Sequence, residues 1–149
     1  MVGWAILTAN VAATLYMTGL IWFVQIVHYP LMATVPPSSF PAYSVAHQRR
    51  TTWVVGPAML IEAVTSVLLI RLHPPGVQST VAVAGFLLIV FIFYRTGLIQ
   101  VPQHRRLATE YDPDLCRALV TSNWWRTIAW TMRSALVLYL LVACATFGG

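Results

Sequence analysis

Four long apolar stretches dominate the pattern of the chain, and shorter segments rich in proline and polar residues separate them. A membrane-spanning α-helix needs roughly 20 residues to cross about 30 Å of hydrocarbon. The helices predicted from the apolar stretches span residues 4–29, 52–72, 79–101 and 123–146. Runs such as residues 64–70 do not alternate between apolar and polar positions, which argues against the strands of a membrane β-barrel. The pattern predicts an all-α fold, an antiparallel bundle of four transmembrane helices in a single domain.

Prolines mark the predicted ends of two of these helices. Pro30 and Pro102 lack the amide donor and disfavour helix in the residue before them, so the first and third helices are expected to end there. The predicted connections are residues 30–51, 73–78 and 102–122. In the last of these, Asp112 or Asp114 could cap a short helix at the membrane surface.

The composition supports this membrane location. Hydrophobic residues make up 58% of the 149 residues and charged residues only 9%, and the mean hydropathy is +0.73. An ordinary soluble domain carries about 25% charged residues. We therefore expect a multi-pass integral protein of a bacterial inner membrane or an equivalent membrane, with the lipid bilayer as its first partner. The net charge of +5 is explained by loop arginines near anionic lipid, and nucleic acid is not expected as a partner.

The arginines also predict the orientation of the bundle. The two longer connections hold Arg49, Arg50, Arg105, Arg106 and Arg117. The opposite side, with both termini and the 73–78 turn, has Arg71 at its edge. Because short loops rich in basic residues stay in the cytoplasm, the longer connections are predicted to be cytoplasmic and both termini non-cytoplasmic.

Three charged residues form a predicted buried network inside the spans. Glu62 lies ten residues into its helix, about 15 Å along the axis. Arg95 and Arg133 reach a comparable depth, and each such charge costs at least about 2.5–3.5 kcal/mol, so all three should face the interior and pair. In the structural interpretation, Glu62 pairs with one arginine and locks the bundle. One carboxylate cannot neutralise two guanidinium groups, so the second guanidinium could interact with an anionic ligand, a quinone carbonyl or a water-filled cavity.

A second polar group gathers at the predicted cytoplasmic ends of the helices. His28 closes the first helix, His47 precedes the second, and His104 follows the third. Side chains expected to bind a ligand or cofactor beside them are His47, Gln25, Gln100 and Trp130. Asn123 and Arg126 begin a polar face of the last helix at helical spacing.

These histidines suggest a metal site. Imidazoles are the commonest metal ligands, and helix bundles build metal sites from His and Glu on facing helices. The candidate ligands are His28, His47, His104 and, in a deeper position, Glu62. The alternative interpretation is that histidines near helix ends bond a lipid phosphate or a loop carbonyl.

A sparse set of residues runs from the first helix to the last. It consists of Gly19-Leu20, His28-Tyr29-Pro30, Pro102 with Leu107, and Asn123-Trp124 with Arg126. This set resembles the pattern of the small four-helix membrane proteins that include anthrone oxygenases. The resemblance implies a four-helix fold and the oxidation of an apolar, polycyclic or quinone-like substrate that arrives from the bilayer. It also implies functional roles for His28, Asn123 and Arg126.

Three functions from different classes follow from these observations. The first is a membrane oxidoreductase or oxygenase, in which His28 and His104 act as base or metal ligands while Asn123 and Arg126 hold a developing oxyanion in a dry site. The second is a haem- or quinone-binding electron carrier. The third is a non-catalytic subunit or transport-type protein in a homo-oligomer or a larger membrane complex. Among cofactors we expect a transition metal before haem, because bis-histidine haem usually takes its ligands from within the spans.

Overall fold

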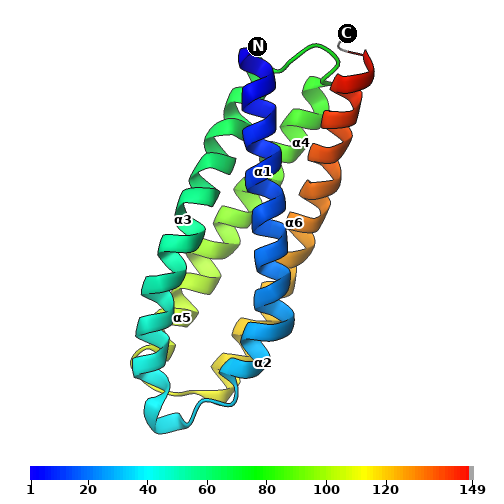
Figure 1. Cartoon of the computed structure of the whole chain (residues 1–149). Coiled ribbons are helices and arrows are strands. Elements are labelled where there is room, and N and C mark those ends of the chain that lie inside the picture. The colour runs from blue at the N-terminus through cyan, green and yellow to red at the C-terminus, as the bar shows by residue number, and fades with distance from the viewer. Residues whose placement is uncertain (148–149) are drawn as a thin grey trace.

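The computed structural model describes residues 1–147 and begins with two long antiparallel helices (Figure 1). The first consists of α1 (Val2–Phe23), the π-helical turn η1 (Val24–His28) and α2 (Tyr29–Met32) in one continuous run. A short 3-10 helix, η2 (Pro37–Ser39), leads into α3 (Phe40–Leu72), which runs back along α1.

The second half of the chain repeats this arrangement. The third long helix consists of α4 (Ser79–Arg95), the π-helical turn η3 (Thr96–Gln100) and α5 (Val101–Leu107), and α6 (Pro113–Phe147) returns beside it. All four long helices are long and apolar enough to cross a membrane. The predicted all-α bundle of four membrane-spanning helices is confirmed.

The helices do not end at the two prolines, contrary to the expectation from the sequence. A π-helical turn precedes Pro30 and another precedes Pro102. In the first, the amide of Tyr29 bonds to the carbonyl of Val24, five residues back instead of four. This wider turn moves the backbone carbonyls that a proline ring would otherwise strike, so the helix continues as far as Met32.

The predicted connections are also mostly helical. Only residues 33–36 and 108–112 separate the helices at that end of the bundle. The predicted surface helix forms the first turns of α6, where Asp112 Oδ1 accepts bonds from the amides of Asp114 and Leu115 at 2.9 and 3.0 Å. Hydropathy locates the end of the hydrocarbon rather than the end of the helix, so it placed the starts of the second and fourth helices too late.

The helices are longer than a bilayer requires. The continuous runs contain 31, 36, 29 and 34 residues, which at 1.5 Å per residue is roughly 44–54 Å, against about 30 Å of hydrocarbon. Exposed Trp22, Trp53, Trp124 and Trp125 lie where an aromatic belt is expected, and the rings of Trp22 and Trp124 meet edge-on at 5.7 Å. The end of the bundle away from the termini therefore extends past this belt.

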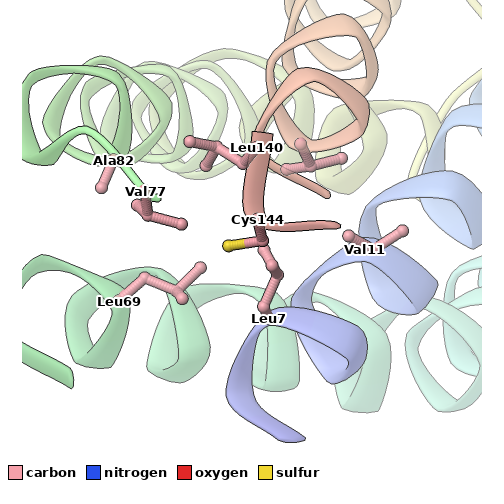
Figure 2. Close-up of a cluster of buried hydrophobic side chains, with 8 residues drawn as sticks. Leu7, Val11, Leu69, Val77, Ala82, Leu140 and Cys144 are labelled. Atoms are coloured by element: carbon pink, nitrogen blue, oxygen red, sulfur yellow. The ribbon is translucent and has the colours of Figure 1, made fainter. Parts of the chain in front are cut away.

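The opposite end is closed by a small apolar core. Figure 2 shows side chains from the helices and the 73–78 turn meeting around Cys144. Gly76 adopts a φ of +87°, and a Cβ there would lie 2.9 Å from the carbonyl oxygen of Ala143, so the turn packs tightly on α6. The N-terminus and the end of α6 lie together at this end (Figure 1). Which side of the membrane they face stays a prediction from the arginines.

The outer surface of the bundle is strongly apolar. Large hydrophobic side chains such as Leu60, Val64, Leu87 and Val142 are exposed along the helices. Apolar side chains exposed on every long helix are typical of contact with lipid. The protein is therefore a multi-pass integral membrane protein.

Candidate functional site

A buried ion pair lies in the half of the bundle nearer the termini. Glu62 of α3 is 0% exposed and Arg133 of α6 is 1% exposed, and Arg133 Nε donates to Glu62 Oε1 at 2.6 Å. Thr14 of α1 donates to the same oxygen at 2.9 Å, and Trp130 Nε1 donates to Oε2 at 3.0 Å. Both carboxylate oxygens are therefore satisfied.

The guanidinium of Arg133 is bonded on its other nitrogens as well. Nη1 donates to the carbonyl of Gly85 in α4 at 2.6 Å, and Nη2 donates to Asn10 and Ser66 at 3.1 and 2.6 Å. The free space beside this group is only about 10 Å³. Such a site has no room for a ligand, so the network fastens the four helices together.

Three sequence-based assignments change because of this network. Glu62 is committed to Arg133, so it does not join the histidines as a metal ligand. Trp130 is fully buried and donates to the same carboxylate, which gives it a structural role; its role in binding a cofactor stays a prediction. Arg95 is absent from the network, because its Nη2 donates to the carbonyl of Ser122 at 3.3 Å.

The three histidines converge at the opposite half of the bundle, as their positions suggested. The rings of His28 and His47 stack with centroids 4.3 Å apart, and those of His47 and His104 lie 5.6 Å apart. The Tyr43 hydroxyl lies 3.4 Å from His28 Nε2, and the Thr51 hydroxyl lies 3.3 Å from His47 Nδ1. All three rings are half-buried.

This arrangement does not fit a single metal ion held by His28 and His47 together. An imidazole binds a metal through a lone pair in the plane of its ring. The planes of His28 and His47 are only 15° from parallel and stack face to face, so their lone pairs do not converge on one point. Within residues 1–147, no group of three or more His, Cys, Asp or Glu side chains could hold a metal ion. The metal prediction is therefore not supported by this geometry.

The remaining polar residues hold Arg126 in place. Asn123 Nδ2 donates to Gln25 Oε1 at 2.8 Å, and Arg126 Nη1 donates to Asn123 Oδ1 at 3.0 Å. Gln100 accepts a bond from the Tyr29 hydroxyl at 3.3 Å and donates to Ser122 at 2.7 Å. Gln25 and Gln100 therefore hold neighbouring helices together, and their side-chain amides already have hydrogen-bond partners within the chain.

Arg126 is a buried cation that lacks a counter-charge. Arg126 is only 8% exposed, and its guanidinium carbon lies 5.2 Å from the centre of the Trp130 ring. Nε is buried with no hydrogen-bond partner, and no carboxylate of the described chain forms an ion pair with this arginine. A buried charge is normally paired, so this group is suited to an anionic partner from outside the chain.

A cavity of about 420 Å³ lies against this arginine. One wall is formed by α3, the facing wall by η3 and α5, and Arg126 of α6 lies between them. Its lining residues include His47, Thr51, Gly56, Gln100, His104 and Arg126. The volume is within the range of about 300–1,000 Å³ that small-molecule sites occupy. His28 does not line this cavity; it stacks on His47 from outside.

A smaller chamber of about 60 Å³ adjoins the cavity. The two spaces share five lining residues: His47, Thr51, Val55, His104 and Arg126. The chamber is also lined by four apolar side chains of α1 and η1, Met17, Leu20, Ile21 and Val24, and by Tyr29 of α2.

Two residues of this site had not been identified from the sequence. Thr51 lines both spaces and contacts His47 one helical turn away, a spacing that could have singled it out. Gln48 Nε2 donates to the carbonyl of His104 at 2.9 Å and so ties α3 to α5. It lies in the segment expected to be a connection, where no helical face was considered.

The site can hold a negatively charged oxygen at Arg126 and exchange a proton at His47 or His104. No protein-family model, curated protein or solved structure matches this chain. The function is therefore inferred from the residues that line the cavity.

Proposed function

We propose that the protein is a membrane oxygenase that oxidises a lipophilic, polycyclic or quinone-like carbonyl compound. The observation that carries this proposal is the unpaired, buried Arg126 on the wall of a cavity that also presents His47 and His104. A cation without a counter-charge, beside two proton acceptors, suits a substrate that becomes an oxyanion when it loses a proton.

The chemistry requires a carbon acid. In an anthrone-type compound, the methylene carbon is conjugated through the rings to a carbonyl group. We expect an imidazole, His104 or His47, to take a proton from this carbon while Arg126 binds the oxygen on which the charge develops. Preorganised donors in a site with little water stabilise such a charge far more than they would in water.

The overall reaction balances with dioxygen as the only co-reactant. The methylene carbon gives up two hydrogens and four electrons and becomes a carbonyl. One atom of dioxygen becomes the new carbonyl oxygen, and the other leaves as water with the two hydrogens. No external reductant is consumed, so the chain's own residues need only bind, orient and move protons.

The position of the cavity supports a substrate that arrives from the membrane. Thr52 and Val101 line the cavity and are exposed on the outer surface of the bundle. Compared with the histidines, these two residues lie nearer to the belt of tryptophans. Arg105 lies at the rim and is also exposed. An amphiphilic molecule could therefore keep its rings toward lipid while its oxygen reaches Arg126.

The test is oxygen uptake by the protein in proteoliposomes with a hydroxylated anthrone, with quinone formation followed by absorbance. We expect Arg126→Gln to lower turnover by roughly 10²–10³-fold, the usual effect of removing one oxyanion donor. His104→Gln should lower it by about 10²-fold or more. Arg117→Gln is the matched control, since Arg117 is exposed and paired with Asp114. Full turnover in Arg126→Gln would overturn the proposal.

A further inference from the structure

Arg126 carries its charge in the bundle interior and is held at only one corner of its guanidinium by a hydrogen bond. Within residues 1–147 that bond runs from Nη1 to Asn123 Oδ1. Nε is enclosed and has no partner. Nη2 has no partner in the described chain either, but it is not enclosed, and Arg126 lines the cavity. A buried charge with this single contact would remain largely uncompensated.

The ring of Trp130 supplies a second contact, one helical turn further along α6. The guanidinium carbon of Arg126 lies over this ring, 5.2 Å from its centre, and a cation is attracted to an aromatic face within about 6 Å. Both residues are buried, and the attraction is stronger when both groups are desolvated. A carboxylate in the same place would occupy guanidinium N–H groups. The ring occupies none, because it approaches the guanidinium from its face.

The indole is itself fixed by the ion-pair network. Trp130 Nε1 donates to Glu62 Oε2 at 3.0 Å, while Arg133 binds the other oxygen of the same carboxylate. This bond restricts the rotation of the ring. It also polarises the indole toward a negative charge, which makes the ring face a better partner for a cation. Trp130 therefore contacts the network in one half of the bundle and Arg126 in the other.

We infer that Trp130 is a positioning residue, whose ring holds the Arg126 guanidinium on the cavity wall and leaves Nη2 free for the oxygen of a ligand. The inference rests on the proposed function, because it takes this ligand to be the oxyanion of the lipophilic carbonyl compound. Trp130 lines neither the cavity nor the smaller chamber, so it acts on the ligand through Arg126. Glu62 then has a second role, since its carboxylate orients the ring.

The test compares two substitutions that remove the same hydrogen bond but differ in the ring. Trp130→Phe and Trp130→Leu both leave Glu62 Oε2 without the indole donor, and only Trp130→Phe keeps an aromatic face. The probes are a monohydroxyanthraquinone, at a pH that ionises its hydroxyl group, and anthraquinone, which has no ionisable group. Binding of each probe is measured by equilibrium gel filtration in detergent.

The loss of affinity should depend on the charge of the probe. For the ionised probe we expect a loss of about tenfold in Trp130→Leu and of no more than about threefold in Trp130→Phe. Affinity for anthraquinone should change by less than about twofold in both variants. Trp125→Leu is the matched control, because Trp125 is exposed on the same helix, and it should bind both probes as the unsubstituted protein does.

Hydrogen exchange provides a second readout that needs no ligand. The Nε–H of Arg126 is enclosed, so it should exchange slowly with water and give a separate signal in nitrogen-edited NMR spectra, identified by its absence in Arg126→Gln. We expect this proton to exchange about tenfold faster in Trp130→Leu, where the guanidinium is no longer held from its face, and at a nearly unchanged rate in Trp130→Phe. Trp130→Met makes the same comparison if Trp130→Leu does not fold.

Three results would overturn the inference: equal losses of affinity for both probes in Trp130→Leu, unchanged or tighter binding of the ionised probe, or an unchanged exchange rate of the Arg126 proton. The first would mean that the indole only supports the packing of the helices. A protein that binds neither probe but shows the faster exchange in Trp130→Leu would defeat the proposed oxygenase and leave the positioning role of Trp130 standing.

Discussion

Replacing Glu62 by Gln tests whether the buried ion pair fastens the bundle. The substitution keeps the size and shape of the side chain but removes its charge. Arg133, which is 1% exposed, then stays in the membrane interior with no carboxylate partner. The new amide also introduces donors where the carboxylate had only acceptors. In either orientation its NH₂ group faces existing donors, either Trp130 or the pair formed by Arg133 and Thr14.

The expected cost is large for a single isosteric change. Removing one partner of a buried ion pair destabilises a protein by about 3–5 kcal/mol, because the other charge is left uncompensated. The donor–donor conflict is one part of this cost, since an unsatisfied buried donor alone costs about 1–3 kcal/mol. We therefore expect Glu62→Gln to lower the free energy of unfolding by about 4 kcal/mol. Adding Arg133→Met removes the uncompensated charge, so the double variant should be more stable than Glu62→Gln alone.

The assay is unfolding of the purified protein in mixed micelles by titration with SDS. Glu110→Gln is the control, because Glu110 is exposed in the short connection before α6. It should change the free energy of unfolding by less than about 0.5 kcal/mol. A folded Glu62→Gln variant within about 1 kcal/mol of the unsubstituted protein would refute the fastening role, since that is far below the cost of an unpaired buried charge.

Three further predictions concern the cavity and the ends of the helices. Gly56 lines the cavity, and an added Cβ would meet nothing within 4 Å in the described chain, so Gly56→Leu should lower anthrone turnover by about tenfold. Gly19→Leu, with equally open surroundings away from the cavity, should keep full turnover in the same assay. Asp112→Ala removes the cap of α6 and should cost about 1 kcal/mol in the SDS titration. Gly76→Ala forces a Cβ to within 2.9 Å of the Ala143 carbonyl at a φ of +87°, and should destabilise by more than about 1 kcal/mol, with faster hydrogen exchange in the turn.

The number and the spanning character of the helices could be predicted, because hydrocarbon thickness imposes a length of apolar sequence on each span. The ends of the helices could not be predicted in the same way. Polar residues such as His47 and Gln48 are good enough helix formers to extend α3 beyond the hydrocarbon, where hydropathy falls. The rule that a proline ends a helix failed at Pro30 and Pro102, because a π-helical turn before each accommodates the ring.

The residues that gather at each site could be predicted from the sequence, but which of them pair with one another could not. Helical spacing placed Asn123 with Arg126, and the chain order placed the histidines at one end of the bundle. The sequence could not decide which arginine pairs with Glu62, because that depends on the rotation of α4 and α6 about their axes. It also could not show that the imidazole rings stack, since His28 of η1 is oriented by contacts with Tyr43 and His47 from a different helix, α3.

The ion-pair network and the cavity occupy different lengths of the same bundle. About 10 Å³ is free beside the Glu62–Arg133 pair, against about 420 Å³ beside Arg126. Substitutions at cavity positions such as Thr52 or Gly56 therefore leave the contacts of the Glu62–Arg133 pair untouched. Mutation and selection could vary the ligand at one end of the molecule with little loss of stability, so descendants of this chain could diverge in substrate while they retain the same ion pair.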